Sequence, residues 1–526
     1  MPVAVKRAAC ALAACLALLV LTAPAAGAAE GELVSVSPAA NGAKRMLYRI
    51  GPFQVVPGQN EIGNRIFGEK PPVDGWITRI RPDLVYTNGR VPGVDVIHLH
   101  HGVWLNLSRT DISWPGLPER FFAAGEEKTI STFPKGYGYR YRASDTWLLN
   151  HMIHNLTPVP TEVYMVYEID FIPKTSPEAR GIRPVRPVWL DVENGSAYPV
   201  FDVKKGSGSR GRFTYPTDAK AAYAGRGRRN EWVADRNGVL VATAGHLHPG
   251  GLYTDLYLRR RGERIRSAGC DRRPKGAARG RCARNAPRGR GARAHLFRSN
   301  ARYFEPAGAV SWDVAMTGTR PDWRVKVRRG DVLSTTATYD SSRAAWWESM
   351  GIMITYMAEA GPGRDPFERR VDYPGRPTHG HLAENNNHGG GRGGLPNPLR
   401  MRDGMTVSGP LDVLDFKFTL GDLSLPGPTG RPPVVKRGQS ITFRNVDDPR
   451  AIYHSITSCK PPCNRATGIA YPIADGPVQF ESGTLGSAVP PTTGRLEWQT
   501  PRNLDRGTYT YFCRIHPFMR GAFRVK

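Results

Sequence analysis

The last residues of the chain bring three kinds of metal ligand onto one short loop. Cys513, His516 and Met519 follow the spacing Cys-x-x-His-x-x-Met, and His454 lies upstream in Ile-Tyr-His-Ser-Ile-Thr. Thiolate, thioether and imidazole groups suit a copper ion that cycles between Cu(I) and Cu(II). Two imidazoles and one thiolate with a weak axial methionine make a blue-copper electron-transfer site. The spacing therefore predicts a type 1 copper centre at these four residues.

This ligand pattern resembles that of the cupredoxins, especially the amicyanin and plastocyanin type, whose ligand loop is Cys-x-x-His-x-x-Met. The resemblance covers residues 405–526. It implies a Greek-key β-sandwich that binds one copper ion and passes single electrons. A core thiol or a His-Pro pair also occurs without metal, but four such ligands at these spacings seldom coincide.

Histidines are also concentrated in three short segments of the first two-thirds of the chain. Side chains two residues apart on a strand point to the same face, so a His-x-His pair can hold one metal ion. Adjacent histidines converge only at a bulge or a strand end. The three segments contain His98, His100 and His101, then His151 and His154, then His246 and His248.

The order of these segments resembles that of the copper type II, ascorbate-dependent monooxygenases, the peptidylglycine α-hydroxylating and dopamine β-hydroxylating enzymes. The resemblance covers residues 35–360 and implies two jelly-roll β-sandwiches, each with one copper ion. The implied ligands are His100, His101 and His154 for an electron-entry copper, and His246, His248 and Met350 for a catalytic, oxygen-activating copper.

Several features separate this chain from those enzymes. Ala244 stands where the peptide-processing members have a substrate-binding arginine, so a peptide with a free carboxylate is not the expected substrate. Core packing remains an alternative role for Met350. The segment Gly-His-Leu-His-Pro-Gly-Gly also resembles the stress-upregulated Nod19-like proteins.

These patterns predict an exported copper protein in which a cupredoxin is attached to a monooxygenase-like body. In this interpretation the cupredoxin feeds electrons to O2-dependent hydroxylation of an unknown substrate, and one or two further copper ions are bound. The alternative is a non-enzymatic electron carrier whose body is a scaffold or a docking module. Both require a redox partner or a small-molecule reductant.

The first residues predict export through a signal peptide. Lys6 and Arg7 precede an apolar run, and a small-residue cleavage site ends near Ala28. No later stretch is long and apolar enough to predict a membrane span. The expected location is therefore secreted or extracytoplasmic, where disulfides form. The candidate pairs are Cys270 with Cys282 and Cys459 with Cys463, which leaves Cys513 for copper.

The formal net charge of +27 is concentrated in residues 259–298, where arginines recur among Gly, Ala and Pro. Export and the lack of stacking aromatic residues argue against a nucleic-acid partner. The segment is expected to be a solvated insertion in a hairpin, and the alternative is docking to an anionic envelope or an acidic partner.

Short β-branched and aromatic runs alternate with Gly, Pro, Asn and Asp clusters, which predicts an all-β protein. The expected fold is two jelly-roll-like β-sandwiches followed by the cupredoxin sandwich. The expected segments are a signal peptide at 1–28, sandwiches at 29–178 and 179–360, a Gly/Asn/Pro-rich linker at 361–404, and the cupredoxin at 405–526.

Overall fold

The structure is a computed structural model of the 526-residue chain. It describes residues 31–526 except 59, 197–198, 221, 224–226, 264–291, 305–307, 311, 382–393, 465–472, 474–475 and 488–493. Within these residues the regular elements are β-strands and short 3-10 turns, which confirms the all-β class predicted from the sequence. None of the helical turns described is long and apolar enough to cross a membrane.

The first sandwich consists of two sheets whose inner faces share one core. Trp104 and Tyr167 come from different sheets, and their ring centroids lie 6.0 Å apart. One sheet contains β1 (Glu32–Pro38), β2 (Lys44–Val55), β10 (Thr161–Pro173), β4 (Gly75–Tyr86), β8 (Tyr137–Tyr141) and β7 (Ser131–Thr132). The other contains β3 (Asn60–Phe67), β9 (Trp147–Asn155), β5 (Ile97–Thr110) and β6 (Pro118–Gly125).

The second sandwich is joined to the first by backbone pairing, because β11 (Arg183–Asp191) runs parallel to β8. Its core includes Leu240, Leu256 and Phe297, and Met353 and Met357 pack there as well. One layer consists of β11 together with β22 (Ile352–Ala358), β15 (Gly238–His246), β19 (Val325–Val327), β18 (Val314–Gly318) and β23 (Arg376–Pro377). The other contains β13 (Arg212–Tyr215), β14 (Glu231–Val233), β20 (Val332–Asp340), β16 (Gly251–Arg260) and β17 (Ala292–Tyr303).

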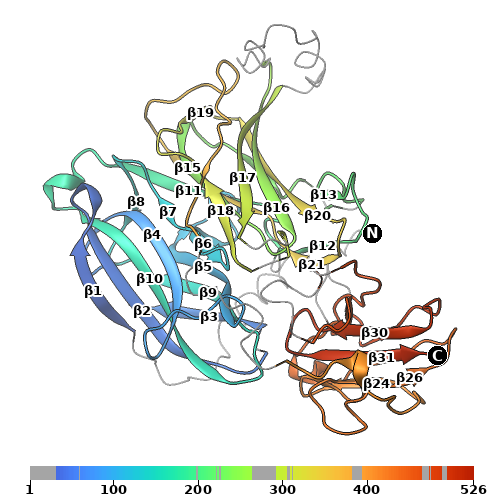
Figure 1. Cartoon of the computed structure of the whole chain (residues 1–526). Helices are drawn as coiled ribbons and strands as arrows, with labels where there is room; N and C mark the ends of the chain where they lie inside the picture. The colour runs from blue at the N-terminus through green and yellow to red at the C-terminus, as the bar shows by residue number, and fades with distance from the viewer. Residues whose placement is uncertain are drawn as a thin grey trace, which may run out of the picture.

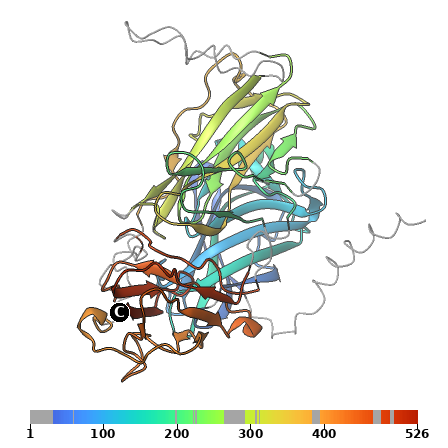
Figure 2. The same ribbon diagram turned by 90° about the vertical axis from the view of Figure 1, so that its right-hand side faces the viewer.

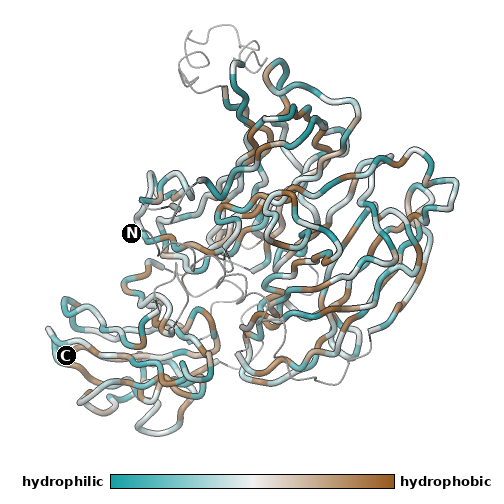
Figure 3. Tube along the Cα trace, turned by 180° about the vertical axis from the view of Figure 1, so that it is seen from behind, coloured by the Kyte–Doolittle hydropathy of each residue, from teal (hydrophilic) through white to brown (hydrophobic). Residues whose placement is uncertain are grey.

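The C-terminal sandwich is a separate body that lies against the other two (Figures 1 and 2). Its core is aromatic and includes Phe418, Phe443 and Tyr511. One sheet contains β25 (Lys417–Phe418), β24 (Leu411–Leu414), β27 (Thr442–Asn445) and β29 (Glu497–Gln499). The other contains β26 (Val434–Val435), β31 (Arg520–Val525), β30 (Gly507–Phe512) and β28 (Thr457–Cys459). Hydrophobic and hydrophilic segments alternate along the trace of all three bodies (Figure 3).

A two-stranded ribbon, β12 (Phe201–Val203) with β21 (Trp346–Ser349), lies where the second sandwich meets the C-terminal one (Figure 1). The guanidinium of Arg514 lies 4.6 Å from the ring centroid of Trp346 and 4.5 Å from that of Trp347. The same group donates a hydrogen bond to the Ala345 carbonyl. Arg514 therefore holds the Cys513 loop against the body through its contacts with the indole rings of Trp346 and Trp347.

The segment expected to be a linker is partly packed. Phe367 and Val371 belong to the core of the second sandwich, and the 3-10 turn η5 (Pro398–Arg400) is followed by Asp403, which pairs with Arg524 of the C-terminal sandwich. The Gly/Asn-rich stretch between these parts lies outside the described residues, as do the expected signal peptide, Cys270 and Cys282.

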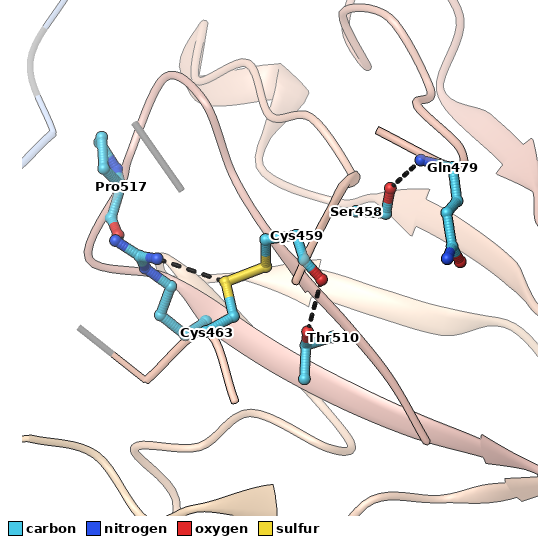
Figure 4. The surroundings of a disulfide bond; sticks show 7 residues. Ser458, Cys459, Cys463, Gln479, Thr510 and Pro517 are labelled. Carbon is cyan, nitrogen blue, oxygen red and sulfur yellow. Dashed lines mark hydrogen bonds between the residues drawn. A yellow bond between two sulfur atoms is a disulfide. The ribbon is translucent and has the colours of Figure 1, made fainter. Parts of the chain in front are cut away.

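Cys459 and Cys463 form a disulfide, as the sequence predicts. Figure 4 shows that the bond lies beside β30, where the Thr510 hydroxyl donates to the Cys459 carbonyl. The guanidinium of Arg520 donates to Cys463 Sγ. The disulfide thus closes the loop after β28, and the two hydrogen bonds link this loop to β30 and β31, the strands that flank the Cys513 loop.

Candidate metal centres

The predicted copper ligands gather at one end of the C-terminal sandwich. β30 ends at Phe512 and β31 begins at Arg520, so the loop between these strands carries Cys513, His516 and Met519. His454 approaches from the segment before β28, which pairs with β30. Donor atoms of His454, Cys513 and His516 lie within 4.8 Å of one another. Cys513 Sγ is 3.9 Å from His454 Nδ1 and 3.6 Å from His516 Nδ1.

Both imidazoles of this centre are oriented through their outer nitrogens. His454 Nε2 lies 2.9 Å from Asp447 Oδ2, and His516 Nε2 lies 3.0 Å from the Gly58 carbonyl oxygen. Each outer nitrogen therefore carries the proton, and the two Nδ1 lone pairs, 3.2 Å apart, face the sulfur. Two lone pairs and a thiolate directed at one buried point fit a copper ion.

The remaining contacts complete the surroundings of the sulfur. The Ser455 N–H donates to Cys513 Sγ at 3.3 Å. The Cys513 N–H donates to the Met519 carbonyl, and Met519 is 1% exposed and belongs to the same core cluster as Cys513. The loop thus buries the Met519 side chain in the same core as Cys513.

The electrostatics of the centre favour a thiolate. Burial alone would raise the pKa of the Cys513 thiol, but His516 and His454 hold it well below its usual range. Burial likewise opposes charge on His454, whose pKa is nevertheless raised by the hydrogen bond to Asp447 and by Cys513. A thiolate is the form that binds metal.

The three histidine segments of the body converge where the first and second sandwiches meet. His98 on β5 is directly opposite His154 on β9 in the strand register. The register of β5 shifts between Leu99 and His101, which is the irregularity expected where adjacent histidines share a site. β15 ends at His246, and His248 follows it. We call His98, His100, His101, His154, His246 and His248 the junction cluster.

The ring spacings group these histidines differently from the two separate sites that the resemblance implies. The centroid of His100 lies 4.4 Å from that of His248 on the second sandwich and 6.2 Å from that of His101. The centroids of His98 and His154 are 5.1 Å apart, and those of His246 and His248 are 5.2 Å apart. The expected electron-entry and oxygen-site histidines therefore lie side by side.

Met350 reaches this cluster only through its backbone in the contacts described. The Tyr339 hydroxyl donates to the Met350 carbonyl at 2.7 Å and accepts from the His248 N–H at 3.1 Å. The Met350 side chain is buried in a hydrophobic cluster with Val200 and Ile352. Its position as a ligand remains a prediction.

Each of three junction histidines has one nitrogen engaged by an acceptor. His98 Nδ1 lies 2.6 Å from the Val94 carbonyl, and His246 Nδ1 lies 3.0 Å from Glu127 Oε2. His154 Nε2 lies 2.8 Å from the Ile515 carbonyl. The following nitrogens are buried with no hydrogen-bond partner in the described part of the chain: His98 Nε2, His100 Nδ1, His101 Nδ1, His154 Nδ1, His246 Nε2 and His248 Nε2.

Most of the junction histidines are neutral. Burial lowers the pKa of His98 to about 3 and that of His100 to about 4. His246 differs, because Glu127 outweighs the effect of burial and raises its pKa to about 9. Burial also raises the pKa of the neighbouring Glu126 to about 8. Neutral imidazole is the form that binds a metal ion.

Each of the two histidine groups donates a hydrogen bond across the interface to the backbone of the body that carries the other group. His516 of the C-terminal centre donates to the backbone of the first sandwich at Gly58, and His154 of the junction cluster donates to the backbone of the Cys513 loop at Ile515. Gly58 has φ +64°, and a Cβ atom there would lie 2.4 Å from Phe416 Cε1 and 2.9 Å from His516 Nε2. Glycine is therefore required for this close approach.

Sequence reasoning did not identify the residues that orient these rings. Gly58 and Glu127 are distant in sequence from His516 and His246, which they contact. Asp447 is near His454 in sequence, but a single acidic residue or glycine carries no spacing signal. Ordinary turns such as Tyr-Thr-Asn-Gly also contain glycines, and the sequence does not distinguish those glycines from Gly58. The adjacent acidic pair Glu126-Glu127 was the one local signal for a buried charged site.

No family model matches the chain, and no relative is found among curated proteins. Among solved structures, an oxidised amicyanin variant is 18% identical, with 23% of this chain and 82% of that chain covered and a TM-score of 0.14. A purple cupredoxin from Nitrosopumilus maritimus is 21% identical, with coverages of 18% and 75% and a TM-score of 0.12. A copper-containing nitrite reductase from Thermus scotoductus SA-01 is 11% identical, covers 55% of each chain and has a TM-score of 0.15. TM-scores this low define neither the fold nor the function of this chain.

Proposed function

We propose that this chain is an extracytoplasmic copper protein whose C-terminal sandwich transfers single electrons at a type 1 centre. The observation that carries the proposal is the convergence of two imidazole nitrogens and one buried sulfur within 4.8 Å. A hydrophobic core thiol would not need two imidazoles whose outer nitrogens are fixed by Asp447 and Gly58. The disulfide between Cys459 and Cys463 supports an oxidising compartment.

The chain's own residues account for the properties such a centre needs. Copper, when bound, supplies one-electron chemistry between Cu(I) and Cu(II). His454, Cys513 and His516 would hold the ion, and Met519 would be the axial ligand. Because the rings are already oriented and the site is closed by packing, little rearrangement accompanies a change of charge.

An exit route for the electron runs from the Cys513 loop into the body. Cys513 is joined through the backbone of Arg514 to Ile515, whose carbonyl accepts the hydrogen bond of His154. This path contains covalent bonds and a single hydrogen bond. The external donor would then be a redox protein or a small-molecule reductant that contacts the C-terminal sandwich.

A second function, O2-dependent hydroxylation by the body, is favoured over a scaffold role by the junction cluster. Its six buried nitrogens have no hydrogen-bond partner among the residues described. Buried polar atoms without a partner cost about 1–3 kcal/mol each, so a purely structural module would be expected to satisfy or replace them. The substrate would be an organic molecule other than a peptide with a free carboxylate.

The visible spectrum of the copper-loaded full chain tests the electron-transfer proposal. We expect an absorption band near about 600 nm from the copper–thiolate bond, and we expect Cys513→Ser to abolish it and to lower the copper content. The double variant Cys459→Ala/Cys463→Ala removes the two other described cysteines and should keep the band. A colourless parent protein after oxidation and copper loading would contradict the proposal.

Oxygen consumption separates the two roles of the body. The reduced, copper-loaded chain should consume O2 if the body is catalytic. A fully loaded protein that returns electrons only to a redox partner would be a carrier.

A further inference from the structure

We infer that the junction between the first and second sandwiches binds a second copper ion through His98, His100 and His154, with His248 as a fourth ligand from the other sandwich. The choice of copper rests on the proposed function, whereas the site itself rests on its own geometry. The ligand set differs from the two sites implied by the resemblance, because it includes His98 and crosses between the two sandwiches.

The first argument is the state of the ring nitrogens. The Val94 carbonyl fixes the proton of His98 on Nδ1, and the Ile515 carbonyl fixes that of His154 on Nε2. The opposite nitrogen of each ring is therefore a lone pair. Those nitrogens, His98 Nε2 and His154 Nδ1, are buried and receive no hydrogen bond within the described chain. A ring with one nitrogen held by a carbonyl and the other left free is the usual arrangement of a metal-binding histidine.

The second argument is the spacing of the rings. The centroids are 5.9 Å apart for His98 and His100, 5.1 Å for His98 and His154, and 6.0 Å for His100 and His154. Rings bound to one ion at metal–nitrogen distances of about 2.0–2.1 Å have centroids about 5–6 Å apart. The three pairwise distances therefore suit a single ion between the rings.

The third argument is the packing that surrounds these rings. The Trp312 ring centroid lies 4.3 Å from that of His98 and 6.1 Å from those of His100 and His154, so one indole packs against all three imidazoles. Such packing limits access of water to the site. His248 completes the set because its ring is 4.4 Å from that of His100 and its Nε2 is buried without a partner in the residues described.

The donors of this site are less tightly gathered than those of the C-terminal centre. Among the described residues, the trio with all donors within 4.8 Å is His454, Cys513 and His516. Rotation of the junction rings must therefore accompany binding. Four neutral imidazoles and no thiolate form a borderline nitrogen site, which suits copper or zinc.

Copper counting on the full chain tests the inference. Metal-free protein is titrated with Cu(II), and bound copper is measured by elemental analysis and electron paramagnetic resonance. We expect two copper ions in the parent and one in Cys513→Ser. The remaining ion should give an ordinary Cu(II) signal with nitrogen coupling and no band near about 600 nm.

Variants of the junction distinguish this site from other copper. His98→Gln and His248→Gln should each bind one copper ion while they keep the 600 nm band, which also shows that the variant is folded. His151→Gln is the matched control, because His151 lies on β9 with His154 but packs against Phe53; it should bind two. A parallel titration with Zn(II) should show competition for the junction ion.

The outcomes separate this inference from the proposed function. One ion in the parent and none in Cys513→Ser would overturn the junction site and leave the C-terminal centre standing. Two ions in both His98→Gln and His248→Gln would also overturn it, since the second ion would then lie elsewhere. One ion in both the parent and Cys513→Ser, with its loss in His98→Gln, would support the junction site and overturn the type 1 centre.

Discussion

The C-terminal centre and the junction cluster use the same means of orienting histidines but differ in how closely they gather their donors. In both, a carbonyl or a carboxylate holds one ring nitrogen and leaves the other free. The C-terminal donors come from one loop and one adjoining segment and lie within 4.8 Å. The junction donors come from β5, β9, the end of β15 and the residues just after it, and the centroids of neighbouring rings are 4.4–6.2 Å apart.

The two centres also differ in charge. In the C-terminal centre, and against the effect of burial, His516 and His454 lower the pKa of Cys513, while Asp447 and Cys513 raise the pKa of His454. The junction has no thiolate: burial lowers the pKa of His98 and His100, and Glu127 raises that of His246 to about 9. The C-terminal donors already lie within 4.8 Å of one another, whereas the junction rings would have to move closer together to share one ion.

The largest effect on copper binding at either region is expected from a change at Asp447. Asp447→Asn removes the charge that holds His454 Nε2, and it should weaken copper binding at the C-terminal centre by about 10–100-fold. A competition titration followed near about 600 nm measures the change. Asp422→Asn changes another buried aspartate of the same sandwich, which bonds to Phe418 and Ser424, and should leave the affinity unchanged. An unaltered affinity in Asp447→Asn would show that the ring is positioned by packing alone.

A change at His154 tests whether the two regions act together. His154→Phe removes the hydrogen bond to Ile515, so electrons leaving the Cys513 loop should reach the body more slowly. We expect the band of the reduced protein to return about tenfold more slowly after O2 is added, as measured by stopped-flow absorption. His151→Gln should reoxidise at the parent rate. Equal rates in His154→Phe would place the exit route elsewhere.

Gly58 tests the interface from the other side. Gly58→Ala should destabilise the protein by about 1 kcal/mol through its positive φ, and its Cβ should also displace His516 and shift the visible band. Gly89→Ala has a similar φ of +81° but no atom within 4 Å, so it should cost less and cause no spectral change. Matching spectra for both variants would contradict the contact between Gly58 and His516.

The smallest effect concerns a histidine that belongs to neither region. His295 lies between Asp255 and Asp372, and although burial opposes its charge, these carboxylates raise its pKa. Its pKa in the folded state is above that of the unfolded chain, so its stabilisation is fully present below about pH 6.5 and is lost as the pH rises through the folded value. We expect about 0.5 kcal/mol, seen as a shallower pH dependence of thermal unfolding in His295→Gln. An identical pH profile would show that the ion pairs contribute nothing.

Local patterns predicted much of what the structure contains. The β-rich class follows from alternating β-branched residues and turn residues, and it is confirmed. The disulfide between Cys459 and Cys463 follows from the cysteine spacing in a chain that is expected to be exported. The spacing of Cys513 and His516 on one loop predicted two side chains that lie together in the fold, because a short loop between two paired strands leaves its side chains little choice of position.

The sequence by itself determined which residues carry ligand chemistry, since donor types and short spacings are local properties of the chain. Only the tertiary structure decided which of them meet. The contact of His100 with His248, the role of Gly58 beside His516, and the hydrogen bond from His154 to Ile515 each join segments far apart in the chain. Such contacts depend on how the sandwiches pack against one another, and that packing is set by the sum of many weak interactions that no single motif records.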